Sequence, residues 1–144
     1  MTDLLGEDIV IVMNGEPSGK GRPKFVRATG RAFTPEKTRN FEENLSWAGQ
    51  VAMAGRPLLQ EPVVVKIWAY MSVPKSMPKK RLADALLGRA FPARKPDADN
   101  IAKSVLDALN KVCFVDDGQV VDLHVFKRYS EQPRLEIWIS SKST

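Results

Sequence analysis

The chain has 144 residues, 43% of them hydrophobic and 27% charged, which is the composition of one ordinary globular domain. No apolar run approaches the roughly 20 residues of a membrane-spanning helix, and the lone Cys113 excludes an intrachain disulfide. The acidic start of the chain is unlike a secretory signal, so we expect a cytoplasmic protein.

The net charge of +5 is unevenly distributed along the chain. Residues 20–39 carry seven basic side chains and one acid, and residues 75–95 carry seven more against Asp84 alone. Residues 97–122 are the reverse, with six aspartates against two lysines. Basic segments favour a polyanionic partner. An acidic centre between them is what a metal-dependent phosphodiesterase needs, and a protein that only coats DNA has no use for it.

The first half of the chain predicts a strand, a hairpin and a helix. Residues 8–14 form a β-branched apolar run typical of a strand. Gly and Pro make 15–23 a loop, and 24–34 fits a short hairpin around Ala-Thr-Gly. Thr34 then caps a helix whose apolar residues recur every three or four positions until Gly55.

The second half predicts a central strand followed by helices and two further strands. Residues 62–73 are apolar almost throughout, which favours a central strand. Residues 79–88 have a weak helical pattern and 99–112 a stronger one. Residues 119–128 and 134–140 alternate as strands around a turn. The order predicts a single α+β or mixed α/β domain, with helices packed against one mixed sheet.

The acidic segment predicts where the chemistry lies. Pro96 disfavours helix at the residue before it, so Asp97 lies in the approach and Asp99 near the helix start. Lys103 follows Asp99 by four residues and therefore shares its helical face. Asp116 and Asp117 begin the turn into the next strand, which can run back beside the helix. We therefore expect aspartates from the two loops to converge on one site.

Such a site suits Mg²⁺, which prefers oxygen ligands and usually keeps several waters. The ion can lower the pKa of an attacking water and neutralise charge on a phosphodiester, and Lys103 can orient or offset the same phosphate. Structural alternatives remain open for each residue. Asp99 can be only a helix cap, Asp-Asp-Gly only a turn, and Asp99, Lys103 and Asp107 only a solvated ion-pair ladder.

Other signals are weaker. Gly15 to Gly21 lacks the spacing of a nucleotide-binding P-loop, because three residues separate its glycines and Gly21 follows Lys20. A DNA-contacting loop or a merely solvated one are the alternatives. The residues expected to bind DNA phosphates are Lys20, Arg22, Lys24, Arg94 and Lys95.

The remaining distinctive side chains predict structural roles. His124 lies in an alternating strand, and Cys113 has no base partner and is expected to be buried. Trp47, Trp68 and Trp138 fall on apolar faces, which favours core or dimer interface over base stacking.

The motif Asp97-Ala-Asp-Asn-Ile-Ala-Lys103, then Asp107-Ala-Leu-Asn-Lys111, then Asp116-Asp-Gly-Gln-Val-Val-Asp122 resembles the signature of the RusA family of Holliday-junction resolvases. These are bacterial and phage-encoded endonucleases. The chain departs from the family pattern in two respects. Here 22 residues, 74–95, separate the long strand from the first aspartate, and the spacing from Asp99 to the pair Asp116-Asp117 is one residue shorter.

The resemblance implies a RusA-like domain over 1–144 that works as a homodimer. It implies binding of four-way junctions and paired, symmetric nicks in DNA recombination and repair, with Mg²⁺ as cofactor and Mn²⁺ as a possible substitute. By position, Asp97, Asp99 and Asp117 match the catalytic metal ligands, with Asp116 beside them, and Lys103 matches the catalytic lysine. Two other functions stay open: a nuclease for flaps or forks, and a DNA-binding protein without catalysis.

Overall fold

The fold is built on a four-stranded mixed sheet. The computed structural model describes residues 8–19, 24–26, 31–33 and 36–142. The strands run in the order β1-β6-β4-β5. Their bounds are Ile9–Asn14 for β1, Val63–Met71 for β4, Val120–Tyr129 for β5 and Arg134–Ser141 for β6. β4 pairs in parallel with β5 and antiparallel with β6, which also pairs antiparallel with β1.

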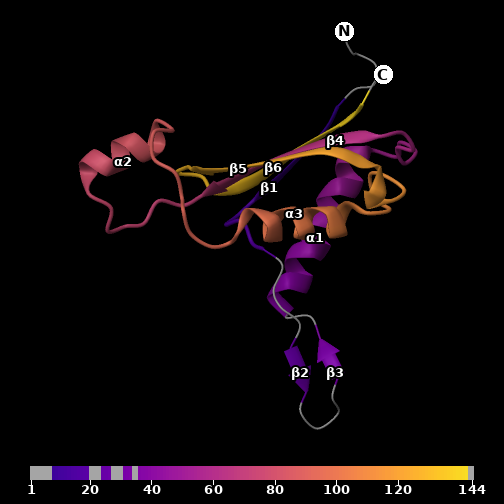
Figure 1. The fold of residues 1–144 in the computed structure, drawn as a ribbon, viewed down its shortest axis with the longest axis horizontal. Helices are drawn as coiled ribbons and strands as arrows, with labels where there is room; N and C mark the ends of the chain where they lie inside the picture. The colour runs from indigo at the N-terminus through magenta and orange to yellow at the C-terminus, as the bar shows by residue number, and fades with distance from the viewer. Residues whose placement is uncertain (1–7, 20–23, 27–30, 34–35, 143–144) are drawn as a thin grey trace.

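Two helices cover one face of this sheet, α1 (Glu36–Met53) near β1 and α3 (Ala98–Leu109) near β5 (Figure 1). The covered face alternates along β4, whose odd-numbered residues from Val63 to Met71 are all buried. The two helices contact each other closely at Gly49, where a Cβ atom would lie 2.7 Å from the Leu109 side chain. Any larger residue at this position would require the Leu109 side chain to shift.

Two parts of the chain project from this body (Figure 1). The hairpin of β2 (Lys24–Val26) and β3 (Arg31–Phe33) lies beyond the start of α1, and the short helix α2 (Lys79–Leu86) lies beyond the end of β4. Both carry basic residues in the sequence.

The predicted class and element order are confirmed, with differences at boundaries and connections. α3 ends at Leu109, three residues early, because the Asn110 backbone turns to an extended conformation. The tight turn after Tyr129 does not join a hairpin, since β4 lies between β5 and β6. The predicted cap at Thr34 lies outside the described residues.

The other face of the sheet is not covered by a helix among the described residues (Figure 1). It is rich in aromatic rings: Trp68 stacks on Phe126 at 5.1 Å between centroids and meets Trp138 edge-on at 6.0 Å. Trp138 is 42% exposed here, and Trp47 on α1 is 67% exposed. Of the two roles predicted for these tryptophans, a core role is therefore wrong for both, because apolar periodicity does not show which face remains uncovered. The dimer interface stays a prediction.

Candidate functional site

Asp97 and Asp99 stand together at the amino-terminal end of α3. Asp97 occupies the N-cap position with an extended backbone, but its side chain makes no capping hydrogen bond. Asp99 lies in the first turn, as predicted, so the alternative in which Asp99 is only a helix cap does not hold. Both side chains are exposed, and Lys95 donates to the Asp97 carboxylate at 3.1 Å. Helix dipoles favour negative charge at this end. Apart from the Lys95 contact to Asp97 Oδ2, the two carboxylates make no hydrogen bond or ion pair among the described residues.

Lys103 lies on the exposed face of α3, one turn beyond Asp99, and Asp107 follows one turn later. The opposite face is anchored in the core by Ile101, Val105 and Leu109. This amphipathic division keeps the charged face directed at solvent along the whole helix. Among the described residues, Asp99 and Lys103 form no ion pair with each other, so the predicted ladder does not hold at this step.

The second acidic group is a structured turn before β5. The Asp116 carboxylate accepts from the Gly118 N–H at 2.9 Å, and the Gln119 side chain accepts from the Asp116 N–H at 2.8 Å. Gln119 also donates to the Leu59 and Glu61 carbonyls, both at 2.9 Å. The predicted turn role of Asp-Asp-Gly is therefore confirmed. It leaves Asp117 exposed at the start of the 3₁₀ turn Asp117–Gln119.

The two acidic groups lie at opposite ends of α3. Its 12 residues extend about 18 Å. The chain before Asp97 is held near the end of β4, where Arg94 donates to the Ser72 carbonyl at 2.8 Å. The turn containing Asp117 leads into Val120, which pairs with Val63 at the start of β4. The described residues of one chain hold no group of three or more His, Cys, Asp or Glu that could bind a metal.

The expected convergence of aspartates therefore does not occur within one chain. The prediction failed because it placed Asp117 beside the helix start, whereas the intervening turn is short and leaves Asp117 at the helix end. The structure brings Asp97, Asp99 and Lys95 together and keeps Asp116 and Asp117 apart from them.

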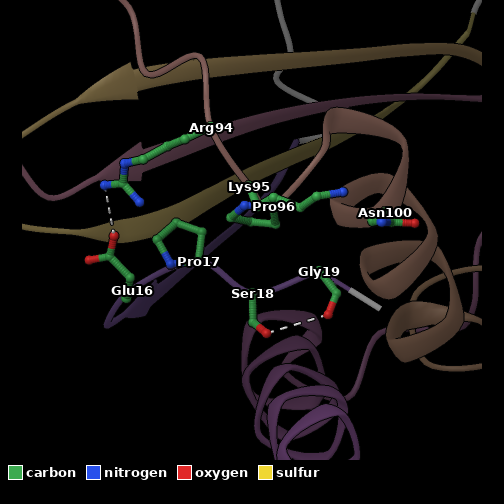
Figure 2. Close-up of a pocket in the computed structure, with 8 residues that line it drawn as sticks. All are labelled: Glu16, Pro17, Ser18, Gly19, Arg94, Lys95, Pro96 and Asn100. Carbon is green, nitrogen blue, oxygen red and sulfur yellow. Dashed lines mark hydrogen bonds and ion pairs between the residues drawn. The ribbon is translucent and has the colours of Figure 1, made fainter. Parts of the chain in front are cut away.

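A pocket of about 400 Å³ lies at the start of α3, where two of its lining residues, Lys95 and Pro96, directly precede Asp97 (Figure 2). It is lined by Glu16, Pro17, Ser18, Gly19, Arg94, Lys95, Pro96 and Asn100. Gly19 is the point of closest approach, since a Cβ there would lie 2.9 Å from the Pro96 Cβ and 3.0 Å from the Asn100 Cβ. This contact fixes the loop that follows β1 against the start of α3.

Most of the pocket residues were not singled out from the sequence. The signals were the glycine spacing in the loop after β1, interpreted as a possible DNA contact, and the predicted phosphate ligands Arg94 and Lys95. That loop's predicted phosphate ligands Lys20 and Arg22, and the side chain of Lys24, lie outside the described residues. Arg94 and Lys95 are exposed at the pocket rim.

Cys113 and His124 do not add to the site. Cys113 is fully buried, as predicted, and burial raises the pKa of its thiol to about 11, so it stays protonated and unreactive near neutral pH. His124 is exposed on the uncovered sheet face, with its ring parallel to that of Phe126. In the part of the chain that the structure describes, no helix is both long and apolar enough to cross a membrane.

Comparison with known proteins accounts for the acidic motif. The chain is 38% identical over 141 residues to the uncharacterized protein YqaN of Bacillus subtilis (strain 168), covering 94% of this chain and 97% of that protein. The model of the family described as endodeoxyribonuclease RusA matches residues 14–140, which include both acidic groups and every strand of the main sheet at least in part. The chain therefore belongs to the RusA family of endodeoxyribonucleases.

Proposed function

We propose that this protein is a Mg²⁺-dependent endonuclease that resolves four-way DNA junctions by paired symmetric nicks, in DNA recombination and repair, in the cytoplasm. Family membership supports the junction as substrate. The observation that carries the proposal is the pair of exposed carboxylates, Asp97 and Asp99, left free by their own helix beside a basic rim. An aspartate with a purely structural role at an N-cap would normally accept a hydrogen bond from a backbone N–H group of the helix.

The donor set at this end of α3 fits a hard divalent cation. Asp97 and Asp99 offer carboxylate oxygens at a solvent-exposed position, and Mg²⁺ is commonly held by one or two carboxylates plus water and phosphate oxygens. When bound, the ion would supply a lowered pKa for the attacking water and charge neutralisation at the phosphodiester. Mn²⁺ has similar ligand preferences and would substitute.

The chain's own cations would place the phosphate. Lys95 already contacts Asp97 and extends from the same wall as Arg94, so both can hold the DNA backbone across the metal-binding end. Lys103 lies one turn from Asp99 and would offset charge that develops on the scissile phosphate.

A second copy of the chain would complete the site. β5 is an edge strand of ten residues, and α3 lies beside it. Antiparallel pairing of β5 with the β5 of a second copy would extend the sheet across a two-fold axis. Because Asp117 precedes β5 while the other end of β5 reaches Arg94 through Lys127, this pairing would set Asp117 of one protomer beside Asp97 and Asp99 of its partner.

The surface next to this edge supports such a dimer. Val115, Val121 and Leu123 are 42%, 55% and 42% exposed, which is unusual for three apolar residues around one edge strand. A two-fold dimer carries two equivalent sites, one for each of two opposed strands of a junction, which is what symmetric nicking requires.

The activity is tested with Asp97→Asn and Asp117→Asn. Each should lower Mg²⁺-dependent nicking of a four-way junction by at least about 100-fold, because a metal ion contributes several kcal/mol to the transition state. Junction binding should persist, since a negative charge near the phosphates is lost. Asp8→Asn, an exposed acid before β1, is the control.

Undiminished nicking in both site variants would refute the assignment. If flaps or forks are cleaved faster than the four-way junction, they are the substrate instead. If the wild type binds the junction without nicking it, the protein is a DNA-binding protein without catalysis.

The shared site is tested by mixing the two inactive variants. A mixed dimer would carry one site with both substitutions and one site with neither, so nicking should return on mixing. If each chain carried its complete site, every site in the mixture would contain one substitution and the mixture would stay inactive.

A further inference from the structure

We propose that the pocket at the start of α3 receives the base of a nucleotide adjacent to the scissile phosphate and makes cleavage sensitive to its identity. This inference rests on the proposed nuclease function and deepens it by assigning a base-recognition subsite.

The position of the pocket is the first argument. Its residues Lys95 and Pro96 directly precede Asp97, and Asn100 directly follows Asp99 (Figure 2). A DNA strand whose phosphate lies at the two carboxylates would therefore have a neighbouring nucleotide close to the pocket. About 400 Å³ falls within the size range of small-molecule sites and accommodates one base.

The chemistry of the lining is the second argument. Pro17 and Pro96 offer apolar ring faces for a base, while Arg94 and Lys95 at the rim can pair with its phosphate. Asn100 provides an amide with two donors and an acceptor, the group that reads base edges. Among the described residues, the half-buried Asn100 side chain makes no hydrogen bond and is absent from those with further partners.

The third argument is that the pocket is held in shape before any ligand binds. Glu16 accepts from both the backbone N–H and the hydroxyl of Ser72 at 3.1 Å and lies 3.7 Å from the Arg94 guanidinium. Figure 2 shows this ion pair at one end of the pocket and Asn100 at the other. The Gly19 backbone closes the remaining side by direct contact with Pro96. The Glu16 charge is thereby offset by Arg94, so the pocket does not repel a phosphate.

The test uses a set of four-way junctions in which each base flanking the cut is varied in turn. Wild-type protein should show a preference of about three- to tenfold at one position, the value of one neutral hydrogen bond. Asn100→Ala should reduce that preference to less than twofold. The preference is a ratio of cut rates, so it does not depend on total activity. Asn40→Ala, an exposed asparagine on α1, should retain the wild-type preference, and thermal unfolding confirms that each variant is folded.

A binding measurement in EDTA separates this inference from the nuclease function. With the bases around the crossover removed one at a time, removal at one position should weaken wild-type binding about three- to tenfold and leave Asn100→Ala binding unchanged. An equal preference in Asn100→Ala and wild type, or no effect of the abasic site on wild-type binding, would overturn the pocket assignment even if nicking is observed. Absence of Mg²⁺-dependent nicking with the abasic effect intact would overturn the activity and support the pocket.

Discussion

At the scale of single residues, Asp97 is informative because it lies at the N-cap of α3 and its side chain does not cap the helix. An aspartate at an N-cap commonly stabilises its helix by about 1 kcal/mol through a hydrogen bond to a backbone N–H. Asp97 makes no such bond and contacts Lys95 instead. Its substitution by asparagine should therefore leave stability nearly unchanged, which makes it a clean test of chemistry.

Cys113 gives a prediction for the pH dependence of stability. Its pKa is raised from 9.0 to about 11 by burial, so the folded state holds the thiol proton more tightly than the unfolded state. This contribution to the free energy of unfolding is complete below pH 9 and is lost as pH rises towards 11. Wild type should lose more stability than Cys113→Ala between pH 8 and 11, by roughly 2 kcal/mol at most. Urea unfolding at a series of pH values measures this, and parallel pH profiles would contradict it.

At the scale of elements, α2 has its charges at the unfavourable end. Lys79 and Lys80 open the helix, no acid lies in its first turn, and the helix dipole disfavours cations there. α2 also makes few contacts with the body of the protein. Local stability therefore does not explain these lysines, whereas a polyanionic partner does.

The double variant Lys79→Gln/Lys80→Gln should weaken junction binding without lowering stability. If both lysines contact phosphates, the slope of log affinity against log salt should fall by about 1.8. Lys66→Gln, a charge removed from the uncovered sheet face, should leave the slope unchanged. Titrations at several salt concentrations by fluorescence anisotropy provide the comparison, and an unaltered slope in the double variant would exclude α2 from the DNA interface.

Local patterns were sufficient to predict the elements, and long-range pairing was not. The continuous apolar run of β4 and the apolar periodicity of α3 predicted both elements correctly, because each reflects burial within the fold. The insertion of β4 between β5 and β6 depends on contacts between residues distant in sequence, so no local sequence pattern indicates it. The same limit applies to the site: its aspartates were found by their spacing, but their separation along α3 required the fold.

At the scale of the whole molecule, the separated aspartates make assembly part of the proposed chemistry. A single chain offers two carboxylates at one end of α3 and Asp117 at the other. The proposed pairing through β5 would bring them together only when two copies meet. Activity should then depend on protein concentration in the range where dimers dissociate.

Leu123→Lys tests that dependence on assembly. The side chain is already 42% exposed, so a lysine there should not unfold the chain, but two lysines near a two-fold axis should repel. Sedimentation should show a monomer in place of a dimer, and nicking should fall together with the dimer fraction. Leu87→Lys, an exposed leucine just after α2, is the matched control and should remain dimeric. A wild type that sediments as a monomer at micromolar concentration would contradict the proposed pairing.

The tight crossing at Gly49 has a mechanical consequence. α1, which has 18 residues, is packed against α3 there, and the β2–β3 hairpin lies beyond the start of α1 (Figure 1). The offset between hairpin and α3 is then set by helix length, in steps of about 1.5 Å per residue. A DNA arm bound by the hairpin would then lie at a set distance from the proposed metal-binding end of α3.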